Sequence, residues 1–140
     1  MIVIDTNIIS EAMRPQPNTM VLEWLNLYSS GQLFITAVSL AEIAYGLRVL
    51  SDGKRKDSLQ RRFEQFIALG FSNRILVFDA HAAAIYAEVM GHNREIGHPM
   101  SFADAQIVAI TKAHGFSLAT RNVKDFKFCD VELINPFLSV

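Results

Sequence analysis

The chain has 140 residues, 51% of them hydrophobic and 19% charged, with a formal net charge of −1. This length predicts a single domain spanning residues 1–140, long enough to bury roughly 70% of the surface that the unfolded chain exposes. A net charge so close to zero excludes the strongly basic overall field that marks many nucleic-acid-binding proteins. Any attraction for a polyanion must therefore be local.

The composition also bears on where the protein works. Its longest apolar stretches are interrupted by acidic residues and fall short of the roughly 20 residues that a transmembrane helix needs. Asp5 and Glu11 precede the first basic residue, Arg14, so the start of the chain lacks the pattern of a signal peptide. The single Cys129 excludes an internal disulfide. We therefore expect a soluble, cytoplasmic protein without a membrane partner.

Short runs rich in β-branched and aromatic residues alternate along the chain with segments of helical periodicity. The predicted strands comprise residues 2–4, 33–36, 75–78, 117–119 and, less distinctly, 131–134. The predicted helices comprise residues 7–13, 20–28, 39–50, 59–67, 81–94 and 102–114, and the predicted loops residues 15–18 and 51–56. Strands separated by helices predict right-handed parallel crossovers, and thus a mainly parallel sheet covered by helices on both faces.

Basic residues are concentrated in two segments. The longer one has six of them against two acidic residues: Arg48, Lys54, Arg55, Lys56, Arg61 and Arg62. Two explanations remain open for it, the solvated face of a helix or a contact with phosphate groups. The shorter segment, with Arg121, Lys124 and Lys127 around Asp125, is a candidate for steering a polyanion toward an otherwise acidic site.

Acidic residues follow the predicted strands at positions where parallel sheets form their sites. Asp5 comes directly after the first strand, Glu42 follows the second and Asp125 follows the fourth. The carboxyl ends of parallel strands lie at one edge of the sheet, and ligands bind in the crevice beyond that edge. We therefore expect these three carboxylates to emerge on the same edge. The sequence leaves the position of Asp104 open, because a predicted helix precedes it.

Each of these acidic residues also has a purely structural explanation. Glu42 and Asp104 stand three residues after Ser39 and Ser101, in the pattern of a capping box whose cap is worth about 1 kcal/mol. Asp5 is suited to cap the first predicted helix, and Asp125 to shape a turn after Asn122. Capping does not exclude metal binding, because a helix N-terminus keeps such a carboxylate ionised and oriented.

Converging carboxylates also predict a particular chemistry. They repel one another and raise one another's pKa unless a cation joins them. Oxygen ligands of this kind suit Mg²⁺ or Mn²⁺, which retain bound water and bind phosphates. The corresponding reaction is hydrolysis of a phosphate ester by metal-activated water. The four histidines show no zinc-binding spacing, and the sequence has no nucleophile elbow, P-loop or dinucleotide-binding motif.

Four segments of the chain carry a family resemblance. They are Asp5-Thr6-Asn7, Ala41-Glu42-Ile43, Ala103-Asp104-Ala105-Gln106-Ile107, and Leu118-Ala119-Thr120-Arg121-Asn122 with Asp125-Phe126. In this order they resemble the PIN-domain ribonucleases and, more narrowly, the VapC/FitB toxins of bacterial toxin–antitoxin pairs. The resemblance spans essentially the whole chain. It implies a three-layer α/β/α PIN-like fold with a parallel sheet and an Mg²⁺-dependent endoribonuclease site.

The resemblance also implies roles for particular residues. Asp5 and Asp104 would be the principal metal ligands, and Glu42 would be a further acidic residue of the site. Thr6 and Thr120 resemble the hydroxyl residues that orient the first aspartate.

The fourth position of the site departs from the family pattern. Many relatives carry an acid two residues after the threonine, where this chain has the neutral Asn122, with Asp125 three residues further on. Two arrangements therefore remain open. Either Asp125 takes part in the site, directly or through water, or Asn122 does so as a neutral ligand.

Two functions of different class follow from these observations. The favoured one is an Mg²⁺-dependent endoribonuclease toxin of a type II toxin–antitoxin system. For this function the resemblance implies a small cognate antitoxin, a complex that binds operator DNA, a homodimer, and an RNA substrate for which transfer RNA is a reasonable expectation. The alternative is a non-catalytic PIN-like binding or regulatory module that uses the acidic pocket for a cation or a basic peptide.

Overall fold

The computed structural model describes residues 1–28 and 31–138. Its centre is a sheet of five short strands: β1 (Ile2–Ile4), β2 (Leu33–Thr36), β3 (Ile75–Leu76), β4 (Ser117–Ala119) and β5 (Leu133–Ile134). All neighbouring strands are parallel, and their order across the sheet is β3-β2-β1-β4-β5. Because β1 is the middle strand, Asp5 leaves the sheet at its centre.

Helices connect the strands. They are α1 (Thr6–Ala12), α2 (Thr19–Leu27), α3 (Ala37–Arg48), α4 (Lys54–Gly70), α5 (Ala80–Glu95), α6 (Phe102–Ala113) and the single turn α7 (Val123–Phe126). None of the helices in the described residues combines the length and the apolar character that crossing a membrane requires.

The strand predictions are confirmed for the three inner strands, whose bounds match residues 2–4, 33–36 and 117–119. The two outer strands are shorter than predicted, because β3 ends at Leu76 and β5 begins only at Leu133. Both lie at an edge of the sheet, where only one neighbour supplies hydrogen bonds to extend the strand. The β-branched pattern therefore continues beyond the paired residues.

The helix predictions differ most from the structure at α4 and α7. Helix α4 begins at Lys54, so the predicted loop over residues 51–56 ends three residues early. The first turn of α4 is charged and has no apolar stripe, which is why periodicity located the helix only from residue 59. Helix α7 was not predicted, because a helix of 4 residues is too short to show a period.

The core consists of two apolar clusters, one on each face of the sheet. Along β1, Ile2 and Ile4 belong to one cluster and Val3 to the other. Along β4, Ala119 joins the first cluster and Leu118 the second. This alternation follows from the period of two residues in a strand, and it lets these strands be apolar on both sides because both faces are buried.

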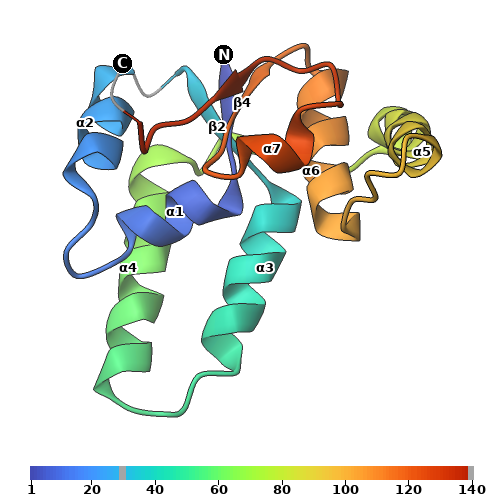
Figure 1. Ribbon diagram of the computed structural model, residues 1–140. Helices are drawn as coiled ribbons and strands as arrows, with labels where there is room; N and C mark the ends of the chain where they lie inside the picture. The colour runs from blue at the N-terminus through green and yellow to red at the C-terminus, as the bar shows by residue number, and fades with distance from the viewer. Residues whose placement is uncertain (29–30, 139–140) are drawn as a thin grey trace.

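Helices cover both faces of the sheet. Buried residues of α1, α2, α3 and α4 belong to the first cluster, and those of α5, α6 and α7 to the second. In Figure 1, α1, α2 and α4 accordingly lie on the left of the strands, and α5 and α6 on the right. The predicted three-layer α/β/α fold with a parallel sheet is confirmed.

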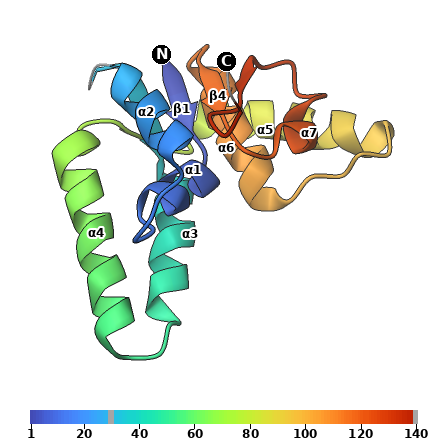
Figure 2. The ribbon, with the colours of Figure 1, turned by 60° about the vertical axis from the view of Figure 1, so that its left-hand side comes forward.

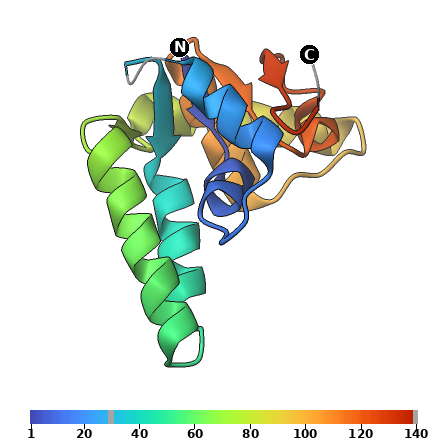
Figure 3. The same cartoon turned by 90° about the vertical axis from the view of Figure 1, so that its left-hand side faces the viewer.

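Helices α3 and α4 run side by side and project away from the sheet as an arm, which all three views show (Figures 1, 2 and 3). The longer basic segment lies on this arm. Lys56 Nζ donates to the backbone oxygen of Arg48 at 3.2 Å and to Asp52 Oδ1 at 3.3 Å, near the loop that joins the two helices. Part of the basic charge is therefore used within the arm itself.

Candidate active site

Asp5 occupies the junction between the middle strand β1 and helix α1. As the N-cap of α1, its Oδ1 accepts a hydrogen bond from the backbone N–H of Thr6 at 2.8 Å. Its Oδ2 accepts from Thr120 Oγ1 at 2.8 Å and from Asn7 Nδ2 at 3.3 Å. The residue is only 4% exposed. Capping and membership of a polar site thus coincide at Asp5, as the sequence allowed.

The surroundings of Asp5 make its negative charge unfavourable. Burial is the main cause, and the charges of Asp104 and Glu42 add to it, so that the pKa of Asp5 rises to about 6. The hydrogen bonds from Thr120 and Thr6 act in the opposite direction, because they favour the charged form. Asp5 thus accepts three hydrogen bonds and is still hard to ionise, because its charge is buried beside other acids and has no positive partner among the described residues.

Glu42 reaches the site through a hydroxyl contact. Thr6 Oγ1 donates to Glu42 Oε1 at 2.7 Å and lies 2.8 Å from Ser39 Oγ. The predicted capping box of Ser39 and Glu42 is wrong, because α3 begins earlier and its N-cap is Thr36, whose side chain accepts from the backbone N–H of Ser39 at 3.0 Å. Glu42 therefore stands in the second turn of α3, where it contacts α1.

Asp104 joins the site from helix α6. Ser101 caps this helix and accepts from the backbone N–H of Asp104 at 3.2 Å, so the serine of this predicted capping box is confirmed as the N-cap. Partial burial raises the pKa of Asp104, and the charges of Asp125 and Glu42 raise it further. The sequence left the position of Asp104 open, because this residue does not directly follow a strand. In the structure Asp104 lines the same pocket as Asp5.

The segment after β4 supplies the remaining polar groups. Thr120 is fully buried, and its hydroxyl both donates to Asp5 and accepts from the backbone N–H of Asn122 at 3.1 Å. Asn122 lines the pocket, whereas Asp125 lies in α7 outside the pocket wall. Asp125 is nevertheless close enough for its charge to raise the pKa of Asp104.

These groups surround an open pocket of about 540 Å³ at the carboxyl edge of the sheet, called the carboxylate pocket below. Its lining residues are Asp5, Thr6, Asn7, Ser10, Glu11, Arg14, Glu42, Asp104, Arg121 and Asn122. Five of them, Asn7, Ser10, Glu11, Arg14 and Arg121, were not among the predicted site residues. Four of these five follow one another at helical spacing on α1 and just beyond its end, which was the available signal.

The composition of this pocket can be compared with the needs of a metal ion. Within the described residues, no three histidine, cysteine or acidic side chains stand close enough to hold a metal by themselves. The pocket offers carboxylates from Asp5, Glu42 and Asp104 and the amide of Asn122. Mg²⁺ takes only one or two protein carboxylates and completes its coordination with water and phosphate oxygens. The residues present therefore fit a hard divalent cation that shares its coordination with water and substrate.

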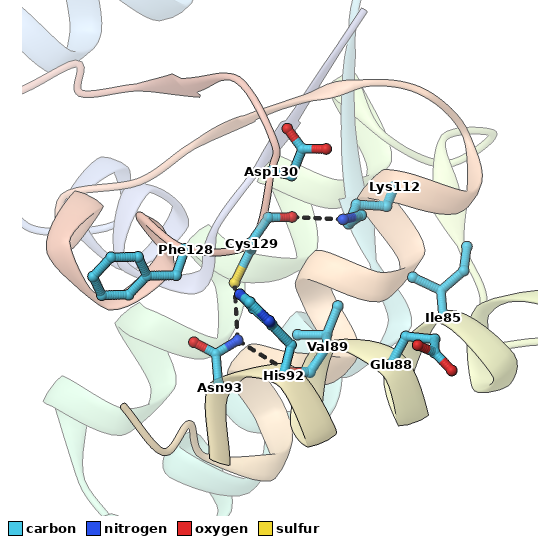
Figure 4. Close-up of a pocket in the computed structure, with 9 residues that line it drawn as sticks. All are labelled: Ile85, Glu88, Val89, His92, Asn93, Lys112, Phe128, Cys129 and Asp130. Carbon is cyan, nitrogen blue, oxygen red and sulfur yellow. Dashed lines mark hydrogen bonds between the residues drawn. The ribbon is translucent and has the colours of Figure 1, made fainter. Parts of the chain in front are cut away.

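A second pocket, of about 450 Å³, has a different character (Figure 4). It lies between α5, α6 and residues 128–130, and it shares no lining residue with the carboxylate pocket. Cys129 is almost completely buried there, and burial raises the pKa of its thiol, so it remains protonated. Neighbouring Asn93 donates to the backbone oxygen of Val89 at 2.9 Å. Two acidic residues, Glu88 and Asp130, line this second pocket, against four in the carboxylate pocket.

Comparison with known proteins places the chain in a family. The family model of the PIN domain matches residues 2–132. The chain therefore belongs to the PIN-domain family, and the resemblance seen in its motifs is confirmed.

The similarity to individual toxins extends over nearly the whole chain. Toxin FitB of Neisseria gonorrhoeae is 40% identical over 137 residues, which cover 98% of this chain and 99% of that protein. VapC ribonuclease Y4jK of Sinorhizobium fredii is 36% identical over 137 residues, which cover 98% of each chain.

Solved structures show the same relation. The chain matches the crystal structure of FitAcB from Neisseria gonorrhoeae with a TM-score of 0.91 and 40% identity, covering 99% of this chain and 100% of that one. It matches VapBC2 from Rickettsia felis, bound to a DNA fragment from its promoter, with a TM-score of 0.83 and 26% identity, covering 96% and 98%.

Proposed function

We propose that the protein is a metal-dependent endoribonuclease and the toxin of a type II toxin–antitoxin pair. The observation that carries this proposal is the pocket lined by Asp5, Glu42 and Asp104, where burial, and to a lesser degree neighbouring carboxylates, raise the pKa values of both aspartates. Neither aspartate has a positive partner among the described residues. A divalent cation supplies that partner and is also what phosphodiester hydrolysis needs. Relatives that match almost the whole chain are named ribonucleases and toxins.

The residues of the pocket suit distinct tasks. Asp5 and Asp104 offer carboxylate oxygens to Mg²⁺ or Mn²⁺, and Thr120 and Thr6 keep the Asp5 oxygens oriented by their hydrogen bonds. When bound, the cation lowers the pKa of water and neutralises charge on the attacked phosphate. Asn122, at the pocket wall, fills the fourth position as a neutral group, in preference to the more distant Asp125.

Glu42 is placed to accept the proton of the attacking water. It is exposed, and only its Oε1 accepts a hydrogen bond from the described residues, so Oε2 remains available to water. In the reaction the water oxygen forms a bond to phosphorus, its proton passes to Glu42 Oε2, and the bond from phosphorus to the leaving ribose oxygen breaks. Solvent supplies the proton that the leaving oxygen takes up.

The partners follow from the same proposal. The matched structures include FitAB bound to a DNA fragment and VapBC2 of Rickettsia felis bound to a DNA fragment from its promoter. We infer that this chain likewise pairs with a small antitoxin, forms a homodimer and binds operator DNA within that complex. We infer that it acts on cellular RNA in the cytoplasm. Transfer RNA is the first substrate to examine.

Cleavage of RNA by the purified protein tests the proposal. We expect cleavage that requires Mg²⁺ or Mn²⁺ and that falls by about 10³-fold or more in both Asp5→Asn and Asp104→Asn, because each loses a ligand charge at the reacting centre. Asp130→Asn is the matched control, since it makes the same change at an exposed aspartate outside the carboxylate pocket. Mapping the new RNA ends in cells after brief expression would identify the substrate.

A folded wild-type protein that leaves RNA as intact as both variants do would contradict the nuclease proposal. Binding of Mg²⁺ or of a basic peptide in the same pocket, without cleavage, would instead support the non-catalytic module.

A further inference from the structure

Arg121 places a guanidinium at the rim of the carboxylate pocket. It follows Thr120 directly after strand β4, is exposed, and lines the pocket together with Asp5 and Asp104. Within residues 1–28 and 31–138, its guanidinium forms no ion pair or hydrogen bond with an acidic side chain. A cation at the edge of an acidic pocket that is paired with none of these acids is available to an external anion.

The backbone and side chain of Arg121 are nevertheless held in place. Its N–H donates to Asn7 Oδ1 at 3.3 Å, and its carbonyl oxygen accepts from Asn135 Nδ2 at 3.4 Å. Its guanidinium carbon lies 4.5 Å from the centroid of the Phe137 ring, in a cation–π contact. Arg121 is thus supported from α1 on one side and from the segment after β5 on the other.

Asn135, which contacts Arg121, also holds Phe137 in place. The backbone N–H of Phe137 donates to Asn135 Oδ1 at 3.0 Å, while the Asn135 amide nitrogen donates to Arg121. The ring is partly buried and packs against the first apolar cluster. A single side-chain amide therefore ties Arg121 and Phe137 together, and the ring gives the guanidinium a stationary surface.

The other arginine of the pocket differs. Arg14 Nη1 donates to Glu11 Oε1 at 3.2 Å and Oε2 at 3.4 Å, so its charge is already partly compensated. The Arg121 guanidinium instead lies over the Phe137 ring, and among the described residues its N–H edges donate no hydrogen bond. Those edges are the part of arginine that binds a phosphate through two hydrogen bonds.

We propose that Arg121, supported by Phe137, binds a backbone phosphate of the RNA next to the phosphate that is cleaved. This inference rests on the proposed ribonuclease function. The carboxylates of the pocket repel RNA, and a fixed guanidinium at the rim supplies a local attraction that the net charge of −1 cannot. Arg121 acts in substrate binding, and Phe137 is a positioning residue that acts through it.

Kinetics on a quenched fluorescent single-stranded RNA of mixed sequence test this role, with Mg²⁺ present and KCl varied. For Arg121→Gln we expect KM to rise about 10-fold with kcat changed less than about 2-fold, as for one lost charge-assisted contact. The slope of log(kcat/KM) against log[KCl] should become shallower by about 0.7, the value for one phosphate contact on a single strand. Arg94→Gln, the same change at an exposed arginine of α5 outside the carboxylate pocket, should alter neither quantity.

Two further variants separate charge from support. Arg121→Lys should restore the salt slope while leaving KM raised, because lysine keeps the charge but lacks the planar fork. Phe137→Leu should raise KM about 3-fold with the salt slope retained, because the ring supports the guanidinium without contacting RNA. Melting temperatures of all variants establish that they are folded.

An unchanged KM and salt slope in a folded, active Arg121→Gln would overturn the inference and leave the nuclease proposal intact. Loss of kcat at constant KM would likewise overturn it, because Arg121 would then act on the reacting atoms. A wild-type protein that neither binds nor cleaves this RNA or any cellular RNA would instead overturn the proposed function, and this inference with it.

Discussion

The two aspartates of the carboxylate pocket are held in unequal ways. Asp5 is almost completely buried and accepts hydrogen bonds from a backbone N–H, a hydroxyl and an amide, the hydroxyl coming from 115 residues further along the chain. Asp104 is half-buried, and the Ser101 hydroxyl is the one hydrogen-bonding group that lowers its pKa. Asp5 is thus oriented before any ligand arrives, whereas the side chain of Asp104 has more freedom.

This difference has a physical reason. Asp5 sits at the end of the middle strand, where β4 and α1 bring donors to it from two sides. Asp104 sits in the first turn of α6 and is only half-buried, so part of its side chain is open to solvent. In the proposed metal site, the fixed carboxylate of Asp5 would set the position of the cation. The freer carboxylate of Asp104 could then adjust to it.

The largest expected difference between the two aspartates is in how they make the free energy of unfolding depend on pH in metal-free buffer. The pKa of Asp5 in the folded protein is about 6, above the value of 3.8 expected in the unfolded chain, so the folded state binds the proton more tightly. The contribution of Asp5 to the free energy of unfolding should therefore be greatest below pH 3.8. It should fall as the pH rises through about 6, by about 3 kcal/mol in total.

Urea denaturation at several pH values measures this effect. Asp5→Asn should abolish most of the fall, whereas Asp104→Asn should reduce it only slightly, because Asp104 is less buried. Addition of Mg²⁺ at neutral pH should stabilise the wild type and not Asp5→Asn. Equal pH profiles for wild type and Asp5→Asn would contradict the idea that the Asp5 charge is uncompensated in the folded protein.

A smaller effect should follow from removing the groups that support each aspartate. Thr120→Val keeps the shape of the side chain but deletes the hydroxyl that donates to Asp5, so we expect activity or Mg²⁺ affinity to fall about 10- to 100-fold. Ser101→Ala, on the side of Asp104, should cost about 1 kcal/mol of stability through its lost helix cap, with activity changed only a few-fold.

Kinetic constants for RNA cleavage over a range of Mg²⁺ concentrations compare the two variants. A loss of activity in Ser101→Ala as large as that in Thr120→Val would remove the proposed difference between a fixed and a freer ligand. Asp104 would then depend on its support as much as Asp5 does.

The smallest effect concerns the basic segment on the α3–α4 arm. Arg62 Nη1 donates to the backbone oxygen of Met13 at 3.2 Å, and Lys56 is bound within the arm, whereas Arg55 lines a groove that also contains Thr6 and Glu42. Neutralising Arg55, Lys56, Arg61 and Arg62 together should reduce the salt dependence of RNA binding, with most of the change due to Arg55. An unchanged salt slope would establish that the segment is a solvated helix face.

Much of the fold could be predicted from local patterns. The bounds of β1, β2 and β4 follow from short β-branched runs, and residues 54–58 of α4 and all of α7 were missed because they show no apolar period. The start of α3 was misplaced because two residues, Thr36 and Ser39, are both good N-caps. Propensity alone does not choose between them, whereas the end of the buried strand does.

The sequence by itself determined the alternation of strands and helices, the parallel sheet and the place of Asp5 at a strand end, because these depend on periodicity and capping over a few residues. Tertiary structure decided which distant groups meet there. It brought Asp104 from α6 into the pocket, left Asp125 outside its wall, and joined Arg121 to Phe137 through Asn135. Such contacts depend on how helices pack across the sheet, which no local pattern records.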